Sequence, residues 1–439
     1  MRSKRSSVGN RMTSDVIIIG AGLAGAAAAL ELSKQGLQAT ILEARDRVGG
    51  RGYARPFAGS EDILDFGGAW ITPWQANIRA LCREHGIVLH PRATVTERRW
   101  FRDGALHRDG PTSAADRLAH ERAIARVAAD AILLKKEHET DEKGRDIARV
   151  SFADYLDRLA PPQSTRDLLS AWWCQSGNAE KSLAPAAELL SSSAYGEGLT
   201  EAMMDVWADT LEGGVSALTQ RMIEASRATL TIAQPVTAIE QQGEMVSVRT
   251  ASERFTARAV VVATGINPMR NIAFVPALPK EKTDAIAVGH LGRAVKVWAK
   301  VKGVPVGIVA SGGGTGIEWM FSERATGDGA TLLVGFGVAA NGWVPDLPRD
   351  IAAAVARFFP EAELLAGDWH DWNADPFALG AWVAAKVGAE AATAASTWKR
   401  HGRLAFASSD FAPEQAGWFE AAIISGRAAA AGILEELGR

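Results

Sequence analysis

The sequence predicts an α/β fold made of two domains, and three observations lead to this prediction. With 439 residues, the chain is long enough for two or more domains around a large core. Both ends of the chain alternate short buried strands with helices, whereas the middle carries long helices followed by strands of alternating polarity. The composition, 47% hydrophobic with a formal net charge of −3, is that of a globular protein and argues against a nucleic-acid partner.

The first element is a βαβ unit. Residues 15–22, DVIIIGAG, form a continuous apolar run that leads into a glycine turn, which is typical of a buried strand. Residues 24–37 follow with apolar side chains at helical spacing, and Gly36 is placed to end this helix. Residues 38–44, QATILEA, indicate a second buried strand. We therefore expect two parallel strands joined by a helix at the start of the chain.

The central part of the chain is predicted to be mostly helical. Residues 113–139 form a long amphipathic pattern with a charged outer face. Ser151 followed by Asp154 is a helix-capping pattern, and a glycine pair opens another helix at residues 212–225. Strands of alternating polarity follow this last helix, within residues 229–265.

The last third of the chain returns to alternating strands and helices. Strands are expected at residues 294–303, 330–338 and 402–410, and helices at residues 350–360 and 417–437. Pro360 ends the first of these helices, because proline cannot continue a helix. No internal repeat or low-complexity segment interrupts the pattern.

Three glycines between the first strand and its helix form a dinucleotide-binding motif. Gly20, Gly22 and Gly25 are spaced G-x-G-x-x-G, and Glu43 closes the second strand. Gly20 permits the tight turn, Gly22 lets the backbone approach a pyrophosphate, and Gly25 lets the helix pack close to the strand. The helix N-terminus supplies N–H donors for the phosphates, and Glu43 can accept from the ribose hydroxyls. The motif alone leaves NAD and FAD open.

The loop that follows the second strand favours FAD over NAD. It reads ARDRVGGR, in which Arg45, Arg47 and Arg51 flank the glycine pair Gly49 and Gly50. Backbone and guanidinium groups can both meet phosphate in such a loop. The string E-A-R-x-R-x-G-G-R resembles the flavin amine oxidases, and the resemblance implies that the cofactor is FAD.

The resemblance to the flavin amine oxidases extends over nearly the whole chain. DFGGAW at residues 65–70, GRAVKVWAKV at residues 292–301 and GWFEAA at residues 417–422 are similar to segments of that family. It implies a two-domain FAD-dependent amine oxidase fold, with a discontinuous Rossmann-like FAD domain and an α+β substrate domain. We expect a disordered N-terminal tail over residues 1–14, an FAD-binding domain made of residues 15–90, 205–275 and 395–439, and a substrate-binding domain made of residues 91–204 and 276–394.

The resemblance also assigns cofactor contacts and implies that the FAD is non-covalent. The residues expected to contact FAD are Gly20, Gly22, Gly25, Glu43, Arg45, Gly50, Arg51, Gly67, Gly68, Ala69, Trp70, Val236, Asp410 and Ile423. Asp410 stands where relatives usually carry Glu, and EAA at residues 420–422 stands where they usually carry E-G-A, which leaves the contacts to the ribityl chain open. Ala381 occupies the position of the cysteine that bonds the flavin in covalent relatives, and alanine has no nucleophile. Neither Cys82 nor Cys174 lies in a motif for such a bond.

Lys296 lies in the alternating strand at residues 294–303 and has two interpretations. From the pattern alone, Lys296, Trp298 and Lys300 share one face of the strand, which would be a solvated edge. The resemblance implies instead that Lys296 holds a water near the N5 atom of the flavin and assists reoxidation or sets the flavin electronics.

The segment ADPFALGAW, residues 374–382, predicts a rigid turn that presents a tryptophan. The resemblance makes Trp382 and Trp418 two aromatic walls around the substrate amine, with the small Gly380 and Ala381 bringing the backbone against the flavin. We expect shape to be the main contribution of the two indoles, because a cation–π gain would favour the unreactive ammonium. Residue type alone leaves core packing as the alternative for both. The same alternative stays open for the further tryptophans considered near the flavin or a channel: Trp74, Trp172 and Trp173.

The resemblance implies that the protein oxidises an amine. The substrate would lose a hydride equivalent from its α-carbon to flavin N5, and water would hydrolyse the imine to a carbonyl compound and an amine or ammonia. One alternative is an L-amino acid oxidase, which needs an arginine for the substrate carboxylate, and Arg92, Arg98 and Arg166 are available. A carbon–carbon desaturase of the same fold is the other. O2 or a redox carrier would reoxidise the flavin.

The N-terminus and the cysteines predict a soluble, cytoplasmic protein. No apolar region follows the basic start MRSKRSSVGNRMTSD, as a secretory signal would require, and no apolar run reaches the length of a membrane span. The two cysteines lie far apart in the sequence, which argues against a disulfide framework. No metal-ligand cluster stands out, and a homodimer is compatible with the sequence.

Overall fold

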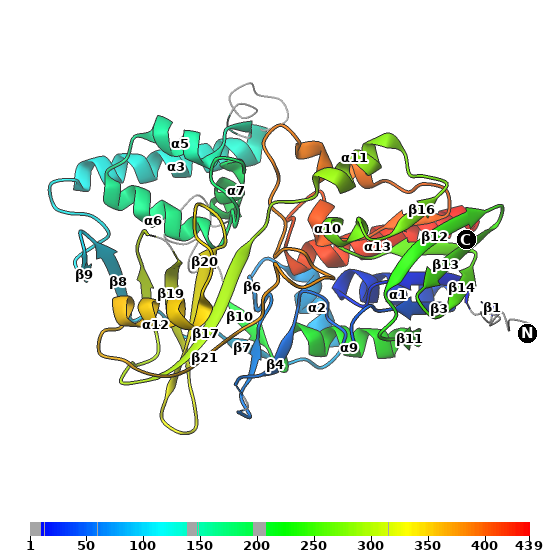
Figure 1. Ribbon diagram of the computed structural model, residues 1–439, viewed down its shortest axis with the longest axis horizontal. Helices are drawn as coiled ribbons and strands as arrows, with labels where there is room; N and C mark the ends of the chain where they lie inside the picture. The colour runs from blue at the N-terminus through cyan, green and yellow to red at the C-terminus, as the bar shows by residue number, and fades with distance from the viewer. Residues whose placement is uncertain are drawn as a thin grey trace, which may run out of the picture.

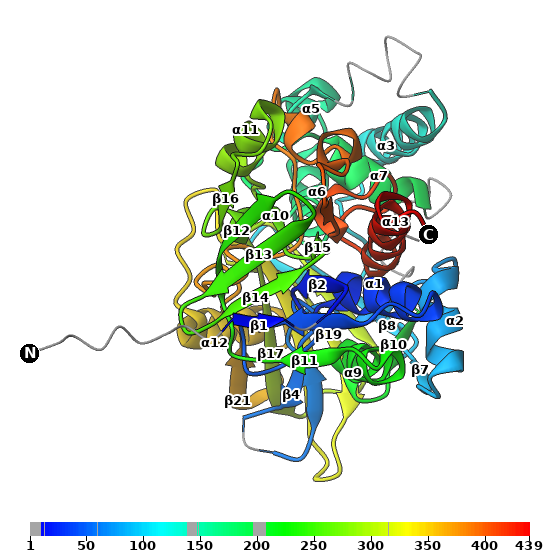
Figure 2. The same ribbon diagram turned by 90° about the vertical axis from the view of Figure 1, so that its right-hand side faces the viewer.

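The computed structural model describes residues 10–12, 14–58, 60–137, 147, 149–195, 208–314 and 316–439. Two halves lie side by side along the longest axis of the molecule (Figure 1). The half that contains the C-terminus lies on the right in Figure 1 and faces the viewer in Figure 2. Each half is built around a sheet whose strands come from separate parts of the chain.

A parallel sheet of five strands forms the centre of the first half. The strand order is β11-β3-β2-β15-β22, and every neighbouring pair is parallel. The strands are β2 (Val16–Ile19), β3 (Ala39–Leu42), β11 (Thr229–Thr231), β15 (Ala259–Val262) and β22 (Leu404–Phe406). All except the edge strand β11 are fully buried, as expected of a parallel sheet that is covered on both faces.

Helices cover one face of this parallel sheet, and a second sheet covers the other. Val16 and Ile18 point toward helices α1 (Leu23–Lys34), α9 (Gly214–Ser226) and α13 (Phe419–Glu436). Ile17 and Ile19 point the opposite way, because side chains alternate along a strand, and pack toward the second sheet. That sheet has the order β1-β14-β13-β12-β16 and consists of β1 (Asn10–Met12), β12 (Val236–Gln242), β13 (Met245–Thr250), β14 (Arg254–Ala257) and β16 (Ala273–Val275).

The segment expected to be a disordered tail, residues 1–14, is in part a strand. Asn10–Met12 form β1, which pairs in parallel with the Arg254–Thr256 stretch of β14. This pairing covers an edge of the second sheet that would otherwise expose unpaired backbone groups. The prediction missed β1 because a polar strand of three residues carries no alternation of polarity. Residues 1–9 and 13 lie outside the described residues.

A sheet of seven strands forms the centre of the second half. Its order is β21-β17-β20-β19-β18-β8-β9, and its pairs are antiparallel except β18 with β8. The strands are β8 (Glu97–Arg102), β9 (Ala105–His107), β17 (Ala294–Lys302), β18 (Ile308–Ser311), β19 (Ile317–Ala325), β20 (Thr331–Val338) and β21 (Glu363–Trp369). Apart from β1, the strands of the three large sheets fall within the residue ranges expected for each domain, and the division into domains stays a prediction.

Helices cover both faces of the seven-stranded sheet. One face packs against α12 (Leu347–Phe358), and the other packs against α3 (Arg117–Glu137), α5 (Phe152–Leu159), α6 (Gln163–Trp173) and α7 (Ala187–Tyr195). Ser151 caps α5 as predicted, because its Oγ accepts the Asp154 N–H at 3.1 Å. Helix α3 begins at Arg117 rather than at Ser113, whose hydroxyl instead accepts the Asp116 N–H at 3.2 Å. The predicted end of α3, at residue 139, lies outside the described residues.

Smaller elements complete the fold. Strands β6 (Trp70–Ile71), β10 (Asp209–Leu211) and β7 (Leu89–Pro91) form a sheet in that order, and β4 (Ala54–Pro56) pairs with β5 (Ile63–Asp65). The remaining α-helices of the described residues are α2 (Ala76–Glu84), α10 (Ile266–Met269) and α11 (Lys280–Val288). Cys82 and Cys174 are both buried and free. Within the described residues, no helix has the length and apolar character needed to cross a membrane.

Candidate functional site

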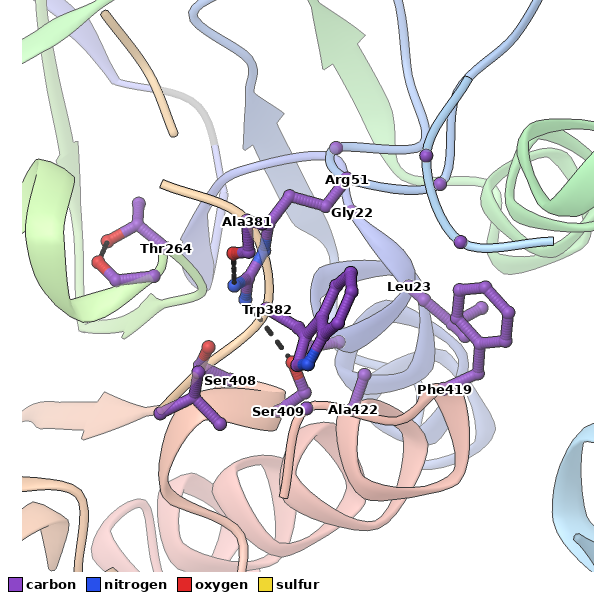
Figure 3. A pocket seen from close by; sticks show the side chains of 18 of the residues that line it. Gly22, Leu23, Arg51, Thr264, Ala381, Trp382, Ser408, Ser409, Phe419 and Ala422 are labelled. Atoms are coloured by element: carbon purple, nitrogen blue, oxygen red, sulfur yellow. Dashed lines mark hydrogen bonds between the residues drawn. The ribbon is translucent and has the colours of Figure 1, made fainter. Parts of the chain in front are cut away.

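A cavity of about 930 Å³ is lined by residues of both halves. Its walls come from the turn between β2 and α1, the loop after β3, the DFGGAW segment, strands β17 and β20, helix α7, the loop before residue 384, and the start of α13. Figure 3 shows part of this lining. The cavity collects all of the predicted site residues except Gly25, Asp410 and Ile423.

The glycine turn after β2 is shaped by close packing. Gly20 has a φ of +108°, and a Cβ there would lie 2.5 Å from the Ala263 carbonyl oxygen. A Cβ on Gly25 would lie 2.1 Å from the Gly20 carbonyl oxygen, so Gly25 lets α1 approach β2 and does not line the cavity. Gly22 is the N-cap residue of α1 and has no side chain to cap it, while Gly22 and Leu23 line the cavity. The first N–H groups of α1 are therefore available to an anion.

Glu43 links the two loops that border this end of the cavity. Its Oε2 accepts the Ala21 N–H at 2.7 Å, and its Oε1 accepts the Arg45 N–H at 2.9 Å. The residue is 3% exposed and lines the cavity. The carboxylate thus braces the glycine turn and also borders the cavity.

The residues at this end fit a dinucleotide. Gly22 pairs with Gly49 in an isolated parallel bridge, and a Cβ on Gly22 would lie 3.9 Å from the Gly50 Cα. The two glycine loops therefore meet without side chains between them. The open cradle offers the N–H groups of α1, which are donors that a diphosphate needs, and Arg45 and Arg51 line the same cavity.

The arginines of the second loop are held in place by partners across the cavity wall. Arg45 Nη2 lies 2.7 Å from Asp375 Oδ1. Arg51 Nη1 donates to the Ala381 carbonyl at 2.8 Å, and its Nη2 donates to Ser409 Oγ at 3.2 Å (Figure 3). These contacts tie the phosphate-facing loop to the 374–382 loop, so that the two ends of the cavity are fixed relative to each other.

Asp410 acts behind the cavity wall. It is fully buried, forms an ion pair with Arg51 and accepts the Ile266 N–H at 3.0 Å. Burial alone would raise the pKa of Asp410, but Arg51 and then His290 hold it below its usual value. Burial lowers the pKa of His290 to about 4, so the imidazole is neutral. Ile423 is likewise fully buried in the core of the first half and does not line the cavity.

Close packing also explains the two glycines of DFGGAW. A Cβ on Gly67 would lie 1.8 Å from the Arg51 carbonyl oxygen, and a Cβ on Gly68 would lie 2.4 Å from the Phe419 ring. A larger residue at Gly67 would therefore displace backbone. The residues of this segment that line the cavity are Phe66, Gly67, Gly68, Ala69 and Trp70.

Lys296 is buried inside the cavity wall and does not lie on a solvated edge. It is 5% exposed, and its Nζ donates to the carbonyl oxygens of Asp65 at 2.7 Å and Gly67 at 3.0 Å. The Nζ also lies 4.5 Å from the centre of the Trp70 ring. Burial lowers the pKa of Lys296 to about 8, although the charge of Asp65 opposes this shift. The ammonium can therefore give up a proton at mildly alkaline pH.

Trp382 and Trp418 both line the cavity, and both are only partly buried. Trp382 Nε1 donates to the Ser176 carbonyl at 3.2 Å, and its ring meets Phe336 edge-on, with ring centres 6.5 Å apart and an angle of 70°. Trp418 is the N-cap residue of α13 and follows Gly417. A Cβ on Gly417 would lie 3.4 Å from the Trp382 Cβ, so the two tryptophans arise from neighbouring stretches of backbone.

The other tryptophans considered from the sequence lie outside the cavity lining. Trp173 is 0% exposed and stacks on Phe152 with ring centres 4.1 Å apart, and Trp172 is 4% exposed in the same core. Both therefore fill a helix face and do not line a channel in the described structure. Trp74 is 38% exposed and does not line the cavity.

Gly380 has a different reason for being small from the one predicted. We expected Gly380 and Ala381 together to bring the backbone against the cofactor. Ala381 does line the cavity, but Gly380 does not. Gly380 has a φ of +145°, and a Cβ there would lie 2.7 Å from the Gly292 carbonyl oxygen and 3.0 Å from His290. It therefore packs the loop against the segment that leads into β17.

Several lining residues were not found from the sequence. Phe336 of β20 lies opposite Lys296 in the strand register, and Gln175, Ser176 and Glu188 line the cavity from the region of α6 and α7. No local signal marks these residues, because strand pairing and helix packing bring them to the cavity from distant parts of the chain.

None of the three arginines considered for an amino acid carboxylate lines the cavity. Arg92 lies over the Phe321 ring, 4.0 Å from its centre, and Arg166 pairs with Asp157 at 3.0 Å. Among the described residues, the arginines that do line the cavity are Arg45 and Arg51, which already have carboxylate partners. This distribution disfavours the L-amino acid oxidase alternative.

The family of the chain is decided by a match over most of its length. The model of the family described as flavin containing amine oxidoreductase matches residues 23–434. The chain belongs to this family. It is an oxidoreductase, and its cofactor is FAD, as the arginine and glycine loop predicted.

Proteins similar to this chain are named as oxidases or dehydrogenases. The chain is 31% identical to (S)-6-hydroxynicotine oxidase of Paenarthrobacter nicotinovorans, over 96% of this chain and 99% of that protein. It is 26% identical to pseudooxynicotine dehydrogenase of a Pseudomonas species, over 94% of this chain and 84% of that protein. A solved structure of putrescine oxidase bound to putrescine superposes with a TM-score of 0.85 at 25% identity, covering 97% of this chain and 100% of that one. The fold is therefore that of the flavin amine oxidases.

Proposed function

We propose that this member of the family oxidises an amine to an imine, which water hydrolyses to a carbonyl compound and an amine or ammonia. The bound FAD supplies the oxidising power by accepting a hydride equivalent from the carbon next to the nitrogen. The observation that carries the proposal is the continuity of the cavity. The glycine cradle at one end and Lys296, Trp382 and Trp418 at the other line a single volume. The amine-oxidising relatives support the same substrate class.

We propose that the FAD is held without a covalent bond. Ala381 lines the cavity and offers no nucleophile, while Cys82 and Cys174 are buried elsewhere and do not line it. Acid precipitation of the purified protein is expected to release all of the yellow flavin into the supernatant. Flavin that stays with the pellet would contradict a non-covalent site.

We propose that Lys296 holds a water near the N5 atom of the flavin and assists reoxidation or sets the flavin electronics. Two N–H groups of its Nζ are committed to the carbonyl oxygens of Asp65 and Gly67, which fixes the direction of the third. Burial brings its pKa to about 8, so that the group can both hold and release a proton. This arrangement suits assistance to reoxidation, whether the acceptor is O2 or a redox carrier.

Trp382 and Trp418 are proposed to confine the amine and to exclude water. Their rings are large and rigid, and the Phe336 edge fixes one side of the Trp382 ring.

The amine must be neutral to donate a hydride equivalent, so reduction of the flavin is expected to speed up as the pH rises through the pKa of the bound substrate. We further propose a cytoplasmic enzyme, in keeping with two free cysteines, and leave a homodimer as compatible with the proposal.

Anaerobic mixing with candidate substrates tests the proposed function. The purified protein with FAD bound is mixed with alkylamines, with L-amino acids and with saturated cyclic ketones, and the yellow absorbance is followed. Bleaching by amines alone is expected. Bleaching by L-amino acids alone would favour the amino acid oxidase, and bleaching by ketones alone would favour a desaturase, so either result would overturn the proposal.

A further inference from the structure

A carboxylate lines the cavity close to the loop that carries Trp382. Glu188 is the second residue of α7, and its Oε1 accepts the Ala385 N–H at 2.8 Å. Ala385 lies three positions after Trp382, and the Trp382 indole N–H donates a hydrogen bond to the Ser176 carbonyl. Glu188 therefore borders the part of the cavity that the second half contributes, away from the glycine cradle of the first half.

The Glu188 carboxylate has no cationic partner among the described residues. No lysine, arginine or histidine forms an ion pair with it there, and Ala385 provides its one described donor. Burial raises the pKa of Glu188 to about 7, with the Ala385 N–H opposing the shift. The ionised form of such a partly buried carboxylate is stabilised when a bound ligand supplies a positive charge beside it.

A second polar group without partners lies in the same wall. Gln175 lines the cavity, and both Oε1 and Nε2 of its side chain are inaccessible to solvent and have no hydrogen-bond partner among the described residues. Buried amides are normally satisfied, so this side chain also indicates a ligand with a polar end. Ser192 of α7 lines the cavity as well. The reactive end of the cavity is aromatic by contrast, with Trp382 and Phe336 in contact.

We propose that Glu188 binds a second, protonated nitrogen of the substrate, so that the preferred substrates are diamines with one neutral and one cationic end. The inference rests on the proposed amine oxidation. The neutral nitrogen lies between the aromatic walls, and the charged nitrogen forms an ion pair with Glu188 and a hydrogen bond with Gln175. A charge-assisted pair in this buried setting distinguishes a diamine from a monoamine of equal length.

The test compares Glu188→Gln with the wild type on straight-chain diamines and on monoamines of matched length. The glutamine keeps an oxygen acceptor for the Ala385 N–H, so the loop that carries Trp382 is retained. We expect kcat/KM for diamines to fall about 10- to 100-fold while that for monoamines stays unchanged. Glu244→Gln, in the exposed turn between β12 and β13, makes the same charge change away from the cavity and is expected to leave both classes unchanged.

A second variant keeps the charge and moves it. Glu188→Asp withdraws the carboxylate by one methylene, so the best diamine is expected to become longer by about one carbon, as the distance to be spanned grows by one bond length. Equal losses for monoamines and diamines in both variants would show a merely structural residue and overturn the inference. So would an unchanged preference for chain length in Glu188→Asp.

Binding without turnover separates this inference from the proposed function. A diamine whose amine-bearing carbons carry methyl groups in place of hydrogen cannot be oxidised, but it can still bind and perturb the flavin spectrum. We expect the wild type to bind it more tightly than the matched monoamine, and Glu188→Gln to lose this difference. If no amine bleaches the flavin, the proposed function fails whatever the binding result; if monoamines bleach it but the diamine shows no preference, the Glu188 assignment alone fails.

Discussion

The two ends of the cavity differ in the groups that form them, which are mainly backbone at one end and side chains at the other. The end that we propose to hold FAD, called the FAD end, is formed mainly by backbone. Gly20, Gly22 and Gly50 leave N–H groups and space there, and the arginines are paired with carboxylates. The end that we propose to hold the substrate, called the substrate end, is formed by side chains from several elements of the second half, among them Trp382 and Glu188. Backbone serves a cofactor that is always the same, whereas side chains can be exchanged as the substrate changes. The variants below test this division.

The largest effect is expected at the junction of the two ends. Lys296→Met should lower turnover by about 100-fold or more, because a preorganised donor is lost, while FAD stays bound to the backbone end. Steady-state oxidation and the rate of flavin reoxidation measure the effect. Lys300→Met is the matched control, since Lys300 lies on the same face of β17 but pairs with Asp328 at 2.7 Å. Wild-type rates in Lys296→Met would remove Lys296 from the reaction.

A substitution confined to the backbone end should act on the fold and on FAD together. Gly25→Ala places a Cβ 2.1 Å from the Gly20 carbonyl oxygen, and the overpacking should destabilise the protein by about 1–3 kcal/mol and reduce its flavin content. Thermal melting and the ratio of flavin to protein absorbance measure both effects. Gly432→Ala in α13 is the control, because its nearest neighbour is the Arg400 side chain at 3.6 Å. Full flavin content in Gly25→Ala would contradict the packing argument.

An effect on stability of similar size, but dependent on pH, is expected at the substrate end. The pKa of Glu188 rises from 4.5 to about 7 on folding, so the folded protein keeps a proton that the unfolded chain releases. This group therefore lowers stability progressively as the pH rises from about 4.5 to 7, and the loss persists at higher pH. Without substrate, Glu188→Gln should gain on the order of 1–3 kcal/mol over the wild type across this window. Denaturation at several pH values measures it, and a constant difference would count against the shifted pKa.

The same division explains what could be predicted from the sequence. The FAD end lies in contiguous motifs, because backbone chemistry demands glycine at fixed spacings, and Gly20, Gly22 and Gly25 could be interpreted one by one. Lys296 could be placed only through the family resemblance, since its strand pattern also fits a solvated edge. Phe336 and Glu188 carry no local signal, because the register of β17 with β20 and the packing of α7 bring them to the cavity. The polar strand β1 was missed for the same lack of pattern.

The central claim, that the backbone end holds FAD while the side-chain end acts on the amine, is tested most directly with Trp382→Ala. The measurement is the rate at which excess amine bleaches the flavin without oxygen, with the flavin content determined in the same sample. We expect full flavin content and a rate at least about 10-fold below that of the wild type, because the variant loses an aromatic wall that contributes on the order of 1–2 kcal/mol. An unchanged rate, or a loss of flavin in proportion to the loss of rate, would contradict it.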